Sequence, residues 1–132
     1  MAAGETPAPL AEGQLAIMNV VWDRGEATVA DVWKELAARR PVARSTVQTM
    51  MTRLEKAGWL ASRADGLAFR YRATRPREAA LGTMVRRLVD SAFGGSAEGL
   101  VLALLHGRGV SRAEARRIRA MIDRAGKEGP NP

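Results

Sequence analysis

Hydrophobic residues recur at helical spacing in three short segments near the start of the chain. The first segment, residues 11–23, ends before Gly25, which provides a left-handed cap. The second begins after Thr28, with Asp31 as the acid of a capping box, and ends at Pro41. The predicted buried stripes of these two helices are Leu15, Met18, Val21 and Trp22, then Val29, Val32, Trp33 and Leu36.

The third segment lies within RPVARSTVQTMMTRLEKAGWL, residues 40–60, and ends at Ala57-Gly58. Its hydrophobic stripe is formed by Val47, Met50, Met51 and Leu54. Threonine is a mediocre helix former, and each one on the other side costs a few tenths of a kcal/mol, roughly. A requirement other than helix stability is therefore expected to explain this polar face, which consists of Arg44, Ser45, Thr46, Gln48, Thr49, Thr52 and Arg53.

The next segment, WLASRADGLAFRYRAT, changes to the two-residue period of a strand. Phe69, Tyr71 and Ala73 alternate with residues that include Arg70 and Arg72, and Asp65-Gly66 is a two-residue turn signal. The pattern predicts a β-hairpin with arginines on one face.

Three more helices are predicted after the hairpin. The first starts at Pro76 and continues to Gly94-Gly95, and the second is capped by Ser96. The second contains LVLALL, residues 100–105, which is apolar all round and is expected to be buried on every side. The last starts at Ser111, with Glu114 completing a capping box, and is expected to bury Ala115, Ile118, Met121 and Ile122.

This element order predicts a mainly α protein with a small β-hairpin wing. We expect a flexible arm at 1–10, a winged helix-turn-helix at 11–75, a three-helix dimerisation domain at 76–126 and a flexible tail at 127–132. In such a fold the third helix enters the major groove of DNA and the hairpin touches the backbone beside it. The three tryptophans lie on apolar stripes or at a strand start and are expected in the core.

Charge and composition agree with a nucleic-acid partner and a reducing compartment, although a basic balance alone is equally explained by a GC-rich genome. The 132 residues contain 21 Lys or Arg against 14 acids, for a net charge of +7, and arginine forms bidentate pairs with phosphate. The absence of cysteine excludes disulfides and thiolate sites and agrees with a cytoplasmic location. No apolar run reaches the roughly 18 residues that a membrane span requires, and the first residues do not resemble a secretory signal.

Enzyme chemistry has little support in the sequence. His106 is the only histidine, so one chain cannot build a histidine triad or a multi-histidine metal site. The segment GGSAEG lacks the lysine and the preceding strand of a phosphate-binding loop. We expect no catalytic residue, metal or cofactor.

The polar face of the third helix has the chemistry to read DNA bases. Thr and Ser suit either kind of base edge, Gln suits adenine and Arg suits guanine. Arg70 and Arg72 of the hairpin, joined by Arg63, would neutralise phosphates. The alternative is a winged helix that serves as a protein-interaction module, with a merely solvated polar face; it would need an apolar patch there.

A second copy of the chain would bury the apolar stripes of the C-terminal helices, and twofold pairing is the commonest oligomer symmetry. A dimer would also read two half-sites instead of one. The residues expected at this interface are Leu81, Met84, Val85, Leu88, Val89, Phe93, Leu100, Val101, Leu104, Leu105, Ile118, Met121 and Ile122.

Four segments, in order and spacing, resemble the penicillinase-repressor family of transcription regulators, the BlaI/MecI/CopY group. They are AIMNVVWDRGEATVADVWKEL, STVQTMMTRLEKAGWL, AFRYRAT and FGGSAEGLVLALL, and together they extend over nearly the whole chain. The resemblance implies a homodimeric repressor on a palindromic operator with TACA and TGTA elements. It also implies base reading by the matching positions of the third helix, and a wing contact by Arg70 with Tyr71 as its packing or backbone-contacting neighbour.

Three features depart from the family pattern. Arg44 stands where many members have an aromatic residue, and the cysteine-rich copper hook of copper-responsive members is missing. Antibiotic-responsive members are cleaved at an Asn-Phe bond after a membrane sensor protease acts, and the matching position here is Ala103-Leu104. Release by a sensor protease, by a ligand, by another protease specificity or by competition therefore stays open.

Overall fold

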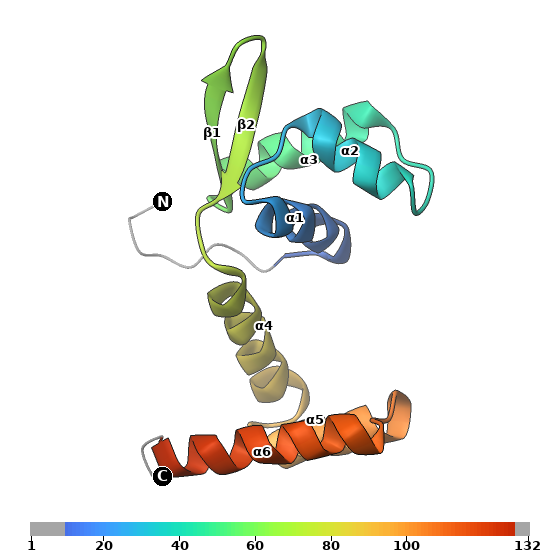
Figure 1. Ribbon diagram of the computed structural model, residues 1–132, viewed down its shortest axis with the longest axis vertical. Coiled ribbons are helices and arrows are strands. Elements are labelled where there is room, and N and C mark those ends of the chain that lie inside the picture. Colours follow the sequence, from blue (N-terminus) through green and yellow to red (C-terminus); the bar gives the residue numbers. More distant parts are fainter. Residues whose placement is uncertain (1–9, 129–132) are drawn as a thin grey trace. The chain divides into compact units, whose positions relative to one another are not determined.

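A computed structural model describes residues 10–128 of the chain (Figure 1). The predicted arm, apart from Leu10, and the predicted tail from residue 129 onward lie outside the described residues. The elements are α1 (Glu12–Arg24), α2 (Val29–Ala37), α3 (Arg44–Lys56), β1 (Leu60–Asp65), β2 (Ala68–Ala73), α4 (Arg77–Ala92), α5 (Ala97–Gly107) and α6 (Arg112–Glu128). The predicted order of three helices, a hairpin and three helices is confirmed.

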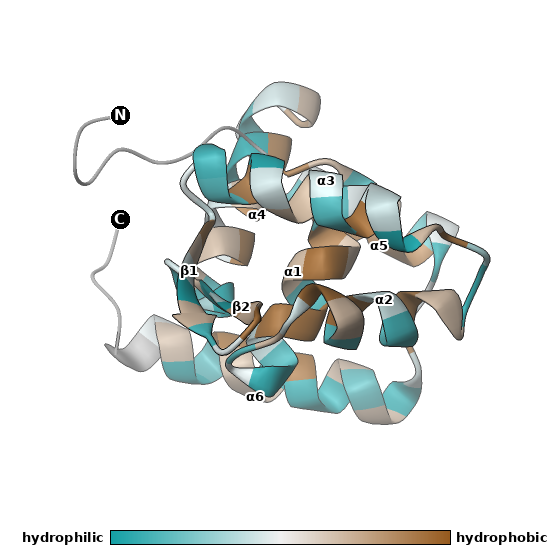
Figure 2. Cartoon of the chain, turned by 90° about the horizontal axis from the view of Figure 1, so that it is seen from above, coloured by the Kyte–Doolittle hydropathy of each residue, from teal (hydrophilic) through white to brown (hydrophobic). Residues whose placement is uncertain are grey.

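The core of the N-terminal part lies between α1, α2, α3 and the hairpin. Ile17 and Met18 of α1, Val32 of α2 and Leu54 of α3 are all 0% exposed. Figure 2 shows α1 as a hydrophobic segment between α2 and α3. The predicted stripes are confirmed, since the remaining stripe residues are buried or packed against this core, as are the three tryptophans. Leu10, which the sequence places in the arm, is also buried in the core.

Local signals fix the helix boundaries. The backbone of Gly25 has φ 84° after α1, and that of Gly58 has φ 93° after α3, a region that favours glycine. The Thr28 hydroxyl accepts the Asp31 N–H at 3.1 Å, and the Asp31 carboxylate accepts the Thr28 N–H at 3.0 Å, so the predicted capping box is confirmed. Helix α2 ends at Ala37, earlier than predicted, and a turn leads from there to Pro41.

The hairpin turn lies one residue later than predicted. The strand register pairs Asp65 with Ala68, so Gly66 and Leu67 form the two-residue turn instead of Asp65-Gly66. Gly66 has φ 65° at the first turn position, where a glycine is favoured in hairpins. The Tyr71 backbone also exchanges two hydrogen bonds with Ala27, at 2.9 and 3.0 Å, which anchors β2 to the connection between α1 and α2.

The start of α4 is attached to α1. The Trp22 indole N–H donates to the Arg75 carbonyl at 2.9 Å, and the Arg77 guanidinium lies 5.5 Å from the centre of the Trp22 ring. Arg77 also donates to Asp23 at 2.6 Å. The chain divides into two units at Met84 and Val85, within α4, so these contacts hold the first half of that helix in the N-terminal unit.

The C-terminal unit exposes most of its hydrophobic side chains. No residue of α5 is buried in the single chain, which corrects the expectation that LVLALL is enclosed on every side. Met121 and Ile122 of α6 are 56% and 62% exposed, against the prediction that they are buried, while Ala115 and Ile118 are partly buried. One chain supplies too few neighbouring elements to cover these stripes.

Among the described residues, no helix by itself has the length and apolar composition needed to cross a membrane. Helices α4 and α5 meet that test only when they are taken together as a bent pair.

Replacing Leu54 with alanine should destabilise the N-terminal unit strongly, because it opens a cavity beneath α3. The expected loss is about 2–5 kcal/mol in the free energy of unfolding, measured by urea titration of tryptophan fluorescence. All three tryptophans lie in this unit, so the signal reports on it directly. Thr49→Ala, at an exposed position of the same helix, should change the value by less than about 0.5 kcal/mol. Equal losses in the two variants would contradict the packing described here.

Candidate nucleic-acid interface

The outward face of α3 carries all the residues that the sequence predicts to read DNA. The buried stripe of Val47, Met51 and Leu54 faces the core, so the opposite side of the helix points to solvent. All seven predicted residues of this helix are exposed, with Arg44 at its N-terminal end in line with the stripe and the other six away from it: Arg44, Ser45, Thr46, Gln48, Thr49, Thr52 and Arg53. The fold thus brings them together on one solvent-facing helix surface.

The first turn of α3 is suited to an anion. Its N-cap residue is Ala43, which has no polar side chain to cover the first backbone N–H groups, and the first turn contains no acid. Helix α2 differs, because Thr28 and Asp31 cap its first turn. An uncapped helix N-terminus carries partial positive charge and free donors, which favours a phosphate or a carbonyl acceptor.

A groove of about 210 Å³ adjoins this turn. Arg44 and Gln48 of α3 line it, together with the start of α2 and the wing residues Leu67 to Tyr71. Arg44 therefore lies where α3 and the wing approach each other.

Tyr71 and Thr52 connect the wing to α3. Tyr71 is 7% exposed, so it packs in the core and is not available as a surface contact. Burial raises the pKa of its hydroxyl, which hydrogen-bonds the Thr52 side chain. The Thr52 hydroxyl also donates to the Gln48 carbonyl at 3.0 Å, so this side chain is partly engaged within the protein.

The wing arginines differ in their partners. Arg63 and Arg70 face each other across the hairpin, and each is held by a carboxylate. Arg63 makes two hydrogen bonds to Glu26, at 2.9 and 3.0 Å, and Arg70 donates to Asp65 at 2.6 Å. Arg72 is exposed on the same face, and none of the ion pairs found in residues 10–128 includes it.

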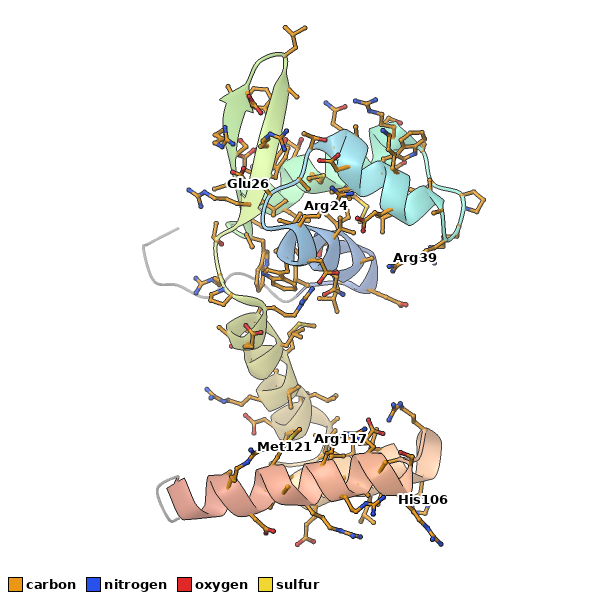
Figure 3. All side chains as sticks on the ribbon, in the orientation of Figure 1. Arg24, Glu26, Arg39, His106, Arg117 and Met121 are labelled. Carbon is orange, nitrogen blue, oxygen red and sulfur yellow. The ribbon has the colours of Figure 1, made fainter. Side chains whose placement is uncertain are left out.

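These ion pairs shift the acidity of both carboxyl groups. The hydrogen bond from Arg63 lowers the pKa of Glu26, and the hydrogen bond from Arg70 lowers the pKa of Asp65. Each carboxylate therefore stays charged at neutral pH and compensates the repulsion between the two facing arginines. Figure 3 shows Glu26 beside the hairpin.

Lys56, one of the cations that the sequence concentrates around the predicted DNA face, is exposed one helical turn beyond Arg53, so it extends the cationic end of α3. Two features of this surface were not predicted. Leu67 is 109% exposed at the wing tip, and Phe69, predicted on the inner face, is 57% exposed because the tip extends beyond the core. The exposure of the tip depends on how far the hairpin extends beyond the core, which residue spacing does not reveal.

The fold and this surface define a winged helix-turn-helix protein. The family model described as penicillinase repressor matches residues 10–124. The chain therefore belongs to the penicillinase-repressor family, and it is a DNA-binding transcriptional repressor by family.

Individual relatives agree with this assignment. The transcriptional regulator BlaI of Mycobacterium tuberculosis is 32% identical over 125 residues, which is 93% of this chain and 90% of that protein. The methicillin resistance regulatory protein MecI of Mammaliicoccus sciuri is 20% identical over 87% of this chain and 94% of its own length. The solution structure of the DNA binding domain of the repressor BlaI matches 55% of this chain and 89% of that domain, at 27% identity and a TM-score of 0.51. These relatives are regulators and not enzymes.

The ion pair between Arg63 and Glu26 should add stability that depends on pH. Because the folded-state pKa of Glu26 is lowered, the contribution is present above the carboxyl's ordinary pKa of about 4.3 and disappears as the pH falls through the lowered value. Arg63→Gln should therefore lower the melting temperature slightly at neutral pH, and this difference should vanish in acid. Arg72→Gln is the control, with no comparable pH-dependent difference. A difference for Arg63→Gln that persists or grows in acid would contradict the assignment.

Proposed function

We propose that the protein acts as a homodimer that represses transcription by occupying a palindromic operator in a promoter. The main observation behind this proposal is that seven polar residues of α3 are exposed together, while Val47, Met51 and Leu54 of the same helix are buried. The family membership supports DNA binding, and the roles of individual residues are inferred from their chemistry and exposure.

The recognition helix supplies the base contacts in this proposal. Gln48 can pair with adenine, and Arg53 with guanine, while the threonine methyl groups suit the methyl group of thymine. Ser45 and Thr49 lie one helical turn apart on the exposed side, so they face the same groove. By resemblance to the family, the operator contains TACA and TGTA elements.

The wing supplies phosphate contacts. Arg72 is the most available of its arginines, because Arg63 and Arg70 are paired with Glu26 and Asp65. A phosphate must compete with a carboxylate for either of the paired arginines. The wing is therefore expected to contribute sequence-independent affinity, mainly through Arg72.

The C-terminal unit supplies the dimer interface. Val101, Leu102 and Leu105 of α5 are about half exposed, as are Val85 and Leu88 of α4. Exposed apolar surface of this extent is typical of a protein interface. Twofold pairing of the same surface would bury it and place two recognition helices on two half-sites.

The release mechanism depends on α5. Ala103 and Leu104, which match the cleavage position of antibiotic-responsive relatives, are exposed in the single chain but lie within the helix. A protease would need local unfolding of α5 to cut there, and dimerisation would cover the site further. We therefore propose release by a route other than cleavage at this bond.

Arg53→Ala should weaken binding to a duplex that carries a TACA/TGTA palindrome by about 1–3 kcal/mol, and it should reduce the preference over a scrambled duplex. Arg72→Ala should weaken both duplexes equally and lower the slope of log affinity against log salt by about 0.9 for each phosphate that the arginine neutralises. A gel-shift titration of both duplexes at several salt concentrations measures these effects. Equal wild-type affinity for the two duplexes would overturn specific recognition and favour the protein-interaction module.

A charged side chain in the exposed apolar surface should dissociate the dimer. Leu102→Glu combined with Ile122→Glu should give a monomer by sedimentation equilibrium, because burying two carboxylates costs several kcal/mol. The affinity of this double variant for the operator should also fall, because a monomer contacts one half-site instead of two. Ala120→Glu, on the polar side of α6, is the matched control and should remain dimeric. A monomeric wild-type protein would exclude this part of the proposal.

A further inference from the structure

Much of the positive charge lies outside the winged helix. Residues 85–132 contain nine Lys or Arg and five Asp or Glu, so they carry more than half of the chain's net charge of +7. This unit is the shorter of the two and contains none of the residues assigned to operator recognition. Its charge therefore needs an explanation of its own.

Three arginines on α6 form a continuous row. Arg112, Arg116 and Arg119 follow the spacing of successive helical turns, so they share one strip of the helix surface over about 10 Å. All three are exposed, and with Ala115 they line a groove of about 430 Å³. We call these three residues the α6 arginine row.

The row has no carboxylate partner in the described part of the chain. None of the ion pairs there involves an α6 arginine, and Glu114 pairs instead with Arg108 at 3.4 Å. Asp123 lies one turn beyond Arg119 on the same side, but no ion pair within residues 10–128 joins them. Like charges one turn apart destabilise a helix, so the row is unfavourable for α6 alone.

The rest of the polar side of α6 reinforces this charge. Arg117 and Arg124 are exposed farther round the helix, and Figure 3 shows Arg117 extending from α6. The apolar stripe that contains Ile118, Met121 and Ile122 is turned away from the row by roughly a third of a turn, at 3.6 residues per turn. The row therefore stays accessible when the stripe is used for dimerisation.

We propose that the α6 arginine row is a second DNA-binding surface, which contacts the phosphates of duplex DNA without reading bases. Guanidinium groups form bidentate hydrogen bonds with phosphate oxygens, and a row of them matches a regularly charged backbone. A nucleic acid is the occupant favoured by charge complementarity, since the protein already belongs to a DNA-binding family. The row adds affinity for flanking or non-operator DNA.

The test is the salt dependence of binding by the full-length protein to a long duplex of random sequence that lacks TACA and TGTA elements. Replacing Arg112, Arg116 and Arg119 together by glutamine should lower the slope of log affinity against log salt by about 2.7 per protomer, if each makes one phosphate contact. Between about 50 and 200 mM NaCl, wild-type binding should weaken about 40-fold more than binding by the variant for each protomer whose row contacts the duplex.

Replacing the same three residues by lysine is the charge-matched control, and it should keep the wild-type slope. Circular dichroism and sedimentation establish that the variants keep their helices and oligomeric state. If the triple glutamine variant does not fold, Arg116→Gln alone should still lower the slope by about 0.9.

An unchanged slope in a folded glutamine variant would overturn the proposal. The proposal would also be overturned if the glutamine variant lost binding to poly-L-glutamate while the salt slope of its DNA binding stayed at the wild-type value. That result would assign the row to an acidic protein. The result is separable from the proposed operator recognition, because Arg53→Ala changes the preference for the palindrome and the row variants change binding to random DNA.

Discussion

Burial of one side of α3 is the constraint on which the rest of the structure depends. Val47, Met51 and Leu54 are completely buried against α1, α2 and the hairpin, so the helix cannot rotate without exposing them. The orientation of the polar side follows from this packing and not from any polar interaction. A face that contributes little to stability is thereby held rigidly towards solvent, which is what sequence-specific recognition requires.

Arg63 and Arg70 of the wing have carboxylate partners that offset their repulsion in the folded hairpin, but these partners reduce its positive charge. Arg63 and Arg70 face each other across the hairpin, and two such charges would repel each other without compensation. Glu26 and Asp65 provide this compensation, and they also reduce the net positive charge of the wing. Arg72 keeps its charge available. The charge balance of the wing therefore depends in part on Glu26, which lies outside its strands.

The two units of the chain differ in how much of their hydrophobic surface they bury by themselves. The N-terminal unit encloses its own core, whereas α5 contains no buried residue and α6 exposes Met121 and Ile122. A second chain would complete the C-terminal unit, and its stability would then depend on protein concentration. The α6 arginine row lies away from the apolar stripe that such pairing would cover, so one helix can serve both assembly and phosphate binding.

The sequence by itself determined the elements, the stripe of α3 and its outward residues, because helical periodicity and capping residues such as Thr28 act over a few positions. The hairpin turn was placed one residue early, since Asp65-Gly66 and Gly66-Leu67 are both acceptable turns and only strand register distinguishes them. Tertiary structure alone decided that Phe69 is exposed on the strand face where Tyr71 is buried, that Glu26 holds Arg63, and that the apolar segment of α5 remains exposed. These outcomes depend on contacts between distant segments, which local patterns do not contain.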